Sequence, residues 1–257
     1  MDCTFPLTIK NPRTNQFIKV PCGMCIHCRI AKVRDWSLRL IHENSLWQDS
    51  CFITLTYSDD NLPLTNCGKM TLFKPDFQNF MKRLRFRVSS PIKYYACGEY
   101  GDNGNRPHYH AIIFGMSCKD LRDFMICWDK GFVTVKPVNA QRCRYVCGYI
   151  QKKIRKNPKE YQSAYGCLQP PFQLMSRGLG LGYLEKNREE YWLTCRNTLN
   201  GVPLSIPRYY LKKDWFLHTK VGLKSDSNPT TEVESYDSAI QRDKNVRAKN
   251  NLKKRKL

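Results

Sequence analysis

The chain has 257 residues and a net charge of +21, a length that supports one good core with appendages but hardly two full domains. A field of that sign favours a polyanionic partner, of which nucleic acid is the usual one. No signal peptide and no run of about eighteen apolar residues is recognisable, so neither secretion nor a membrane span is expected. The thirteen cysteines are therefore expected to be reduced, in a cytosol.

A cluster of cysteines is the first motif along the chain. Cys22, Cys25 and Cys28 follow one another at two-residue spacings, and Cys3 offers a fourth thiolate. Four thiolates around Zn²⁺ would organise a segment that lacks a core of its own. An iron–sulfur cluster fits the same spacings, and His27 is a substitute ligand. The competing interpretation is a set of reduced structural cysteines that bind no metal.

The elements that follow have the order strand–helix–hairpin–helix–strand–helix, which is typical of an α+β fold with helices laid on an antiparallel sheet. Helices are predicted from apolar residues at a period near 3.6, and strands from short β-branched and aromatic runs. In chain order we predict a helix at Arg29–Trp47, a strand at Phe52–Tyr57, a helix at Lys74–Arg87, strands at Tyr94–Glu99 and Arg106–Phe114, a helix near Cys118–Trp128, a strand at Gly131–Lys136 and a helix around Arg144–Ile154.

Two of the five histidines lie on one predicted strand. Alternate residues of a strand point to the same face, so His108 and His110 project together. The turn-rich segment 101–107 makes the two strands a hairpin, which brings Glu99 of the preceding strand near them as a carboxylate ligand. Imidazole is a common metal ligand, so the triad predicts a metal site. The competing interpretation is a histidine pair on the solvent face of a hairpin.

The last predicted helix carries candidate nucleophiles. Tyr145 and Tyr149 are four residues apart, about one turn along a helical face, and Lys152 and Lys153 follow one turn later. The competing interpretation is an amphipathic helix that uses tyrosine as core filler. A metal that polarises a phosphate, beside a hydroxyl nucleophile, is the minimum that covalent phosphoryl transfer requires.

Three motifs together resemble those of the HUH replication initiators, the rolling-circle endonucleases of small circular DNA replicons. They are the strand from Phe52, the Pro-His-Tyr-His strand and Tyr145-x3-Tyr149-x2-Lys152. The likeness runs from about Cys3 to about Tyr210 and is closer to the initiators of the gokushoviruses, small single-stranded-DNA phages of the microvirus group. The segments that carry this closer likeness are Pro21–Arg29, Gly98–Gly101 and Met175–Gly180.

The resemblance implies an α+β HUH endonuclease fold, a central antiparallel sheet flanked by helices, over residues 51–157. Residues 1–50 are expected to form a Cys-rich, mostly irregular segment and a helix, and residues 158–217 an extension packed on the core. Residues 218–257 are expected to form a basic, disordered tail. The last seventeen residues hold eight Lys or Arg and one Asp, so fourteen of the net charges belong to the rest of the chain.

The resemblance also implies a function: metal-dependent nicking of phage origin DNA, a 5′-phosphotyrosine link, rolling-circle replication and later joining of the unit-length strand. The implied site has Glu99, His108 and His110 as ligands of Mg²⁺ or Mn²⁺, Tyr145 or Tyr149 as nucleophile, Lys152 at the phosphate, and Arg83, Arg85, Arg87 and Lys153 at the DNA backbone.

The implied partners are the double-stranded replicative form of the phage DNA, its displaced single strand, and the polymerase and helicase of the bacterial host, in whose cytoplasm the protein would act. Two alternatives stay open. A non-enzymatic single-stranded-DNA-binding or packaging protein would share the charge and aromatic residues, but would need neither the histidines nor a nucleophile. An HUH transposase or relaxase would share the motifs, although two tyrosines at helical spacing favour an initiator.

Overall fold

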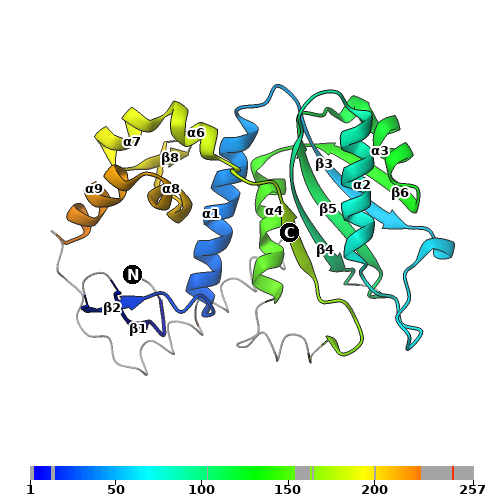
Figure 1. Cartoon of the computed structure of the whole chain (residues 1–257), viewed down its shortest axis with the longest axis horizontal. Coiled ribbons are helices and arrows are strands. Elements are labelled where there is room, and N and C mark those ends of the chain that lie inside the picture. The colour runs from blue at the N-terminus through cyan, green and yellow to red at the C-terminus, as the bar shows by residue number, and fades with distance from the viewer. Residues whose placement is uncertain are drawn as a thin grey trace.

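The computed structural model describes residues 3–12, 15–102, 104–153, 163, 165–199, 201–226 and 245. Its centre is a five-stranded antiparallel sheet (Figure 1) with the strand order β6-β3-β5-β4-β7. The predicted fold class, a central antiparallel sheet flanked by helices, is confirmed. The strands of this sheet are β3 (Ser50–Tyr57), β4 (Lys93–Tyr100), β5 (Pro107–Phe114), β6 (Gly131–Pro137) and β7 (Phe172–Met175).

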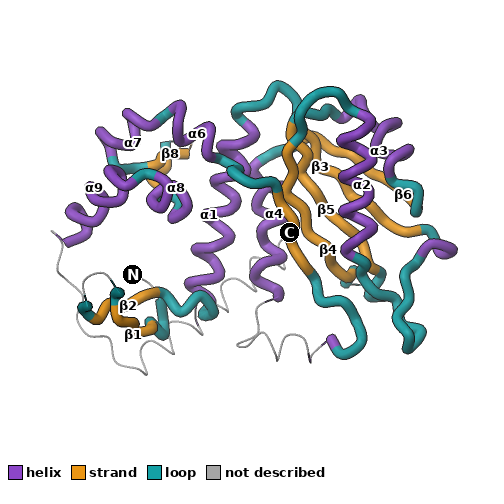
Figure 2. Tube along the Cα trace, in the orientation of Figure 1, coloured by secondary structure: helices purple, strands orange, loops and turns teal. Residues whose placement is uncertain are grey.

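Two pairs of helices cover the two faces of the sheet (Figure 2), α1 with α4 on one face and α2 with α3 on the other. Each follows the apolar period of its sequence, and α2 begins and ends at the residues predicted for it. These helices are α1 (Ile26–Asn44), α2 (Lys74–Arg87), α3 (Leu121–Cys127) and α4 (Ala140–Lys153), with the short 3₁₀ turns η1 (Asp59–Asn61) and η2 (Cys118–Asp120).

The central strands are buried on both faces because their alternate side chains enter two different cores. Ile53 and Leu55 of β3 pack under α2 and α3, together with Phe80. Phe52 packs on the other face with Ile112 of β5 and with residues of α1 and α4. This alternation decides which side chains can reach a site beneath α4.

The register of the central strands aligns the chemically active residues. His108 of β5 lies opposite Glu99 of β4 on one side and opposite Thr56 of β3 on the other. His110 lies opposite Thr54. All of these side chains point to the α1/α4 face, because directly paired residues of an antiparallel sheet share a face.

The N-terminal segment differs from the irregular chain that the sequence predicts. β1 (Leu7–Lys10) and β2 (Phe17–Val20) form an antiparallel hairpin, and α1 begins at Ile26, inside the cysteine motif. Most of the hairpin side chains are exposed, Phe17 by 74%. The prediction failed here because it expects apolar residues of a strand to be buried.

The region from 158 to 217, for which no secondary structure was predicted, is anchored on α1. The hydroxyl of Tyr210 lies 2.9 Å from Nδ1 of His42, and the Gly180 N–H donates to the buried carboxylate of Glu43 at 2.6 Å. Its elements, besides β7, are α6 (Leu181–Lys186), α7 (Arg188–Thr194), β8 (Asn197–Leu199), β9 (Val202–Leu204) and α8 (Arg208–Lys213).

The predicted disordered tail, 218–257, begins too early. Helix α9 covers Trp215–Asp226, because Leu217 and Val221 pack against Tyr210 in a third apolar cluster. The rest of the predicted tail, residue 245 excepted, lies outside the described residues. Within the described part of the chain, none of the helices has the length and apolar character that a membrane span requires.

Candidate metal centre and tyrosine helix

Three side chains from the β4–β5 hairpin converge under α4. One ligand atom each of Glu99, His108 and His110 lies within 4.8 Å of the others. The Glu99 Oε1 atom lies 3.0 Å from Nε2 of His108 and 2.9 Å from Nε2 of His110. The structure therefore brings the predicted triad together, with Glu99 and His110 buried and His108 half-buried.

A second set of contacts fixes both imidazole rings. Nδ1 of His108 lies 3.1 Å from the carbonyl oxygen of Arg106, and Nδ1 of His110 lies 2.9 Å from Oγ1 of Thr54. A carbonyl only accepts, so Nδ1 of His108 donates the hydrogen bond and the Nε2 lone pair of the neutral ring faces the Glu99 carboxylate. Two electron-rich atoms 3.0 Å apart require a cation between them, either a proton or a metal ion.

The electrostatics of the triad favour a bound cation. Burial acts to raise the pKa of Glu99, but hydrogen bonds from His108 and His110 outweigh it and lower that pKa to about 2. Burial acts to lower the pKa of His108, but the Glu99 carboxylate outweighs it and the net direction is upward. The carboxylate is thus ionised at neutral pH, and a divalent ion would replace the proton that it otherwise shares with His108.

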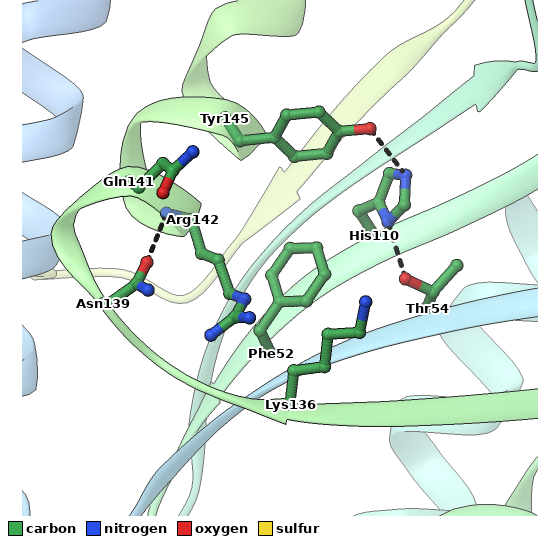
Figure 3. Close-up of a pocket in the computed structure, with 8 residues that line it drawn as sticks. All are labelled: Phe52, Thr54, His110, Lys136, Asn139, Gln141, Arg142 and Tyr145. Carbon is green, nitrogen blue, oxygen red and sulfur yellow. Dashed lines mark hydrogen bonds between the residues drawn. The ribbon is translucent and has the colours of Figure 1, made fainter. Parts of the chain in front are cut away.

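Tyr145 of α4 lies directly over the triad. Its hydroxyl is 3.5 Å from Nε2 of His110, and the two rings meet edge to face (Figure 3). The neighbouring Val146 and Cys147 are buried in the core beneath α4, which turns Tyr145 outward, and its side chain is 48% exposed. This predicted nucleophile therefore reaches both the triad and solvent.

The other predicted residues of α4 are only partly described. Positions 149, 152 and 153 belong to the helix, but the side chains of Tyr149, Lys152 and Lys153 lie outside the described part of the structure. The helix places position 149 one turn beyond position 145.

A cavity of about 290 Å³ opens beside the triad and contains cations that sequence reasoning missed (Figure 3). Lys136 of β6 lies opposite Phe52 in the sheet register, on the same face as His110. Only the pairing of β6 with β3 reveals this position, so no local pattern could have indicated it. The cavity is lined by Phe52, Thr54, His110, Lys136, Asn139, Gln141, Arg142 and Tyr145.

An exposed aromatic ring extends the same face. Phe132 of β6 is 67% exposed and lies opposite Thr56, whose other neighbour is His108. An aromatic residue left in solvent on the face of a basic site offers a surface on which a nucleobase could stack. The sequence pattern did not single it out.

The three arginines predicted to contact DNA lie on the opposite face of the sheet, on α2. Arg83 forms an ion pair with Asp129 at 2.7 Å, and Arg87 one with Asp123. The guanidinium of Arg85 lies 5.3 Å from the centre of the Tyr94 ring. The sequence shows that these residues share a charged helix face, but not which side of the sheet the helix covers. The structure does not bring them to the triad.

An antiparallel sheet with a His-x-His pair on a central strand, a carboxylate on the adjacent strand and a tyrosine helix above them defines a protein of the HUH class. Residues 50–154 match a family model whose description is that of a replication-associated protein of the ORF2 type. The chain belongs to the family of phage replication-associated proteins, and the predicted resemblance to the microvirus replication initiators is confirmed.

Similar proteins come from three phages. Replication-associated protein ORF2 of Spiroplasma virus 4 is 30% identical over 223 residues, 76% of this chain and 68% of the relative. Replication-associated protein VP4 of Bdellovibrio phage phiMH2K is 28% identical over 222 residues, 76% of this chain and 67% of the relative. Replication-associated protein ORF4 of Chlamydia phage 1 is 27% identical over 214 residues, 74% of this chain and 52% of the relative. No solved structure matches the chain.

Proposed function

We propose that this phage replication protein nicks one strand at the phage origin and joins itself to the new 5′ end through Tyr145 or Tyr149. The observation that carries the proposal is the position of the Tyr145 hydroxyl, 3.5 Å from Nε2 of His110 in the Glu99–His108–His110 triad. A hydroxyl nucleophile beside a cation-requiring cluster is the arrangement that covalent phosphoryl transfer needs.

The donor set fits a divalent ion such as Mg²⁺ or Mn²⁺. It combines one ionised carboxylate with two imidazoles whose rings are fixed through Nδ1 by Arg106 and Thr54. When bound, such an ion would withdraw charge from the scissile phosphate and align it for in-line attack.

The tyrosine and the new strand end account for all bonds in the step. A bond forms between the tyrosine oxygen and phosphorus as the bond from phosphorus to the 3′ oxygen breaks. The tyrosine proton leaves to solvent, and the 3′ oxygen takes one up to become a free 3′-OH. A tyrosine hydroxyl has a pKa near 10, so it is a weak nucleophile that depends on charge stabilisation at the phosphate.

The basic residues around the cavity would hold the DNA backbone. We assign this role to Lys136 and Arg142, which line the cavity next to Tyr145. Lys152 would position the scissile phosphate and Lys153 would contact the backbone. The free 3′-OH would prime a host polymerase, with a host helicase opening the duplex, in the cytoplasm of the bacterium.

Replacing Lys136 by alanine is expected to weaken binding of single-stranded origin DNA about tenfold, since one charge-assisted phosphate contact is worth roughly 1.5 kcal/mol. The slope of log affinity against log salt should fall by about one unit, because one fewer counterion is released. Titration at several salt concentrations measures both. Lys82→Ala removes an exposed lysine from α2 on the other face and should leave both values unchanged; an equal effect of the two variants would disprove the assignment.

The proposed function is tested with a supercoiled plasmid that carries the phage origin. Mg²⁺ or Mn²⁺ should convert it to the nicked circle, and neither a chelator nor a plasmid without the origin should give that product. Binding to single strands without any nicking would instead support a packaging or single-strand-binding protein. Insertion of the cut end into unrelated DNA would support a transposase.

A further inference from the structure

Four sulfur atoms converge at the start of α1, far along the chain from the triad. The Sγ atoms of Cys3, Cys22, Cys25 and Cys28 all lie within 4.8 Å of one another. The Cys3–Cys25 and Cys22–Cys28 sulfur separations are both 3.9 Å. A tetrahedral Zn²⁺ with Zn–S bonds of about 2.3 Å holds its sulfurs about 3.8 Å apart. The cluster therefore already has the dimensions of a single-ion tetrathiolate site.

Backbone N–H groups surround these sulfurs as they would surround thiolates. The Sγ of Cys22 accepts hydrogen bonds from the N–H groups of Met24 and Cys25, at 3.4 and 3.3 Å. Gly23 makes this turn possible because its φ of +75° lies in the left-handed region. Such N–H bonds stabilise a negative sulfur much more than a neutral thiol.

The remaining sulfurs have similar donors. The Cys22 N–H donates to Cys3 Sγ at 3.3 Å, and the Cys28 N–H donates to Cys25 Sγ at 3.5 Å. Cys25 is also the N-cap of α1, where the helix dipole favours negative charge. Residues 3–34 contain six Lys or Arg and no Asp or Glu, so the surroundings offset the two net negative charges of a Zn²⁺ with four thiolates.

The β1–β2 hairpin needs such an anchor. Seven of its eight strand residues are exposed and Val20 is half-buried, and an isolated two-stranded hairpin is at best marginally stable in water. Cys3 precedes β1 and Cys22 follows β2, so one ion would close the hairpin at its base. Cys25 and Cys28 would tie that base to the first turn of α1.

We propose that Cys3, Cys22, Cys25 and Cys28 bind one structural Zn²⁺ ion, which replaces the missing core of the hairpin and fixes it to α1. Four thiolates with no open position make a closed site, so the ion holds structure and takes no part in DNA cleavage. An iron–sulfur cluster distributes its thiolates over several iron atoms, which demands wider sulfur spacings than those of this cluster.

Metal analysis of the full-length protein, purified and dialysed under reducing conditions, tests the proposal. About one zinc per chain is expected, and it should remain in the His108→Ala/His110→Ala double variant. Replacing zinc with Co²⁺ should give the intense thiolate-to-cobalt absorption and visible bands of a tetrahedral tetrathiolate. Iron in place of zinc, no bound metal, or Cys3–Cys25 and Cys22–Cys28 disulfides in the reduced protein would each overturn it.

Variants localise the ion without depending on activity. Cys25→Ser and Cys28→Ser should each lower the zinc content severalfold, whereas Cys118→Ser, at an exposed cysteine of η2, should retain all of it. If the serine variants fail to fold, wild-type protein treated with a chelator replaces them. Amide exchange in β1 and β2 should then accelerate more than about tenfold while β3 and β5 stay protected. Unchanged exchange in the hairpin after zinc removal would show that the ion does not anchor it.

Discussion

Replacing His108 or His110 by alanine is expected to reduce origin nicking at least about 1,000-fold, which corresponds to roughly 4 kcal/mol of transition-state stabilisation. Each histidine contributes one of the three ligand atoms that lie within 4.8 Å, and the ion that they would hold stabilises the charge that develops on the phosphate beside Tyr145. DNA affinity should change less than about threefold, because binding comes from dispersed basic residues. Single-turnover cleavage and a filter-binding titration measure the two effects.

A matched control is His218→Ala, at an exposed histidine of α9, which should nick at the wild-type rate. Glu99→Gln should have a milder effect on metal affinity than either histidine variant, because a neutral oxygen ligand remains. Cleavage at the normal rate by metal-free protein, or by the double histidine variant, would show that the triad is not the metal centre.

The second large effect concerns the two tyrosines of α4. A Tyr145→Phe or Tyr149→Phe variant is expected to nick once and form the covalent adduct, but to release no further circular genomes. The first tyrosine is still bonded to the 5′ end when the regenerated origin must be cut, so a second nucleophile is required. The double variant should form no adduct. Gel analysis of labelled origin DNA over several rounds distinguishes these results.

Tyr209→Phe serves as the control for loss of a hydroxyl, since Tyr209 lies on α8 and packs its ring against Arg39, away from the triad. It should support full turnover. If either α4 single variant sustains many rounds at the wild-type rate, the two tyrosines do not alternate and one of them has a structural role only.

The core of the fold was predictable because its elements carry strong local patterns. The apolar stripe of α2 and the β-branched and aromatic runs of β3 and β5 identify those elements without any tertiary information. The β1–β2 hairpin, β7 and the C-terminal helices were missed because they are short. They depend on partners far along the chain, such as Glu43 for Gly180.

The candidate site was predictable to the same extent. A tight turn fixes how β4 pairs with β5, so the sequence places Glu99 beside His108. Lys136 enters the site only through the pairing of β6 with β3, and the position of Arg83 depends on which face α2 covers. Long-range pairing and the choice of face are tertiary facts, which local sequence patterns do not contain.

The most direct test of the central claim is the chemical identity of the residue joined to DNA. Origin DNA should be cleaved with Mn²⁺, the adduct digested with nuclease and then trypsin, and the peptide from Tyr145 to Lys152, which follows Arg144 and ends at a lysine, sequenced by mass spectrometry. We expect a nucleotide attached through its 5′ phosphate to Tyr145 or Tyr149. A cleaved strand whose 5′ phosphate carries no protein, or a nucleotide on a residue outside this peptide, would contradict the proposed mechanism.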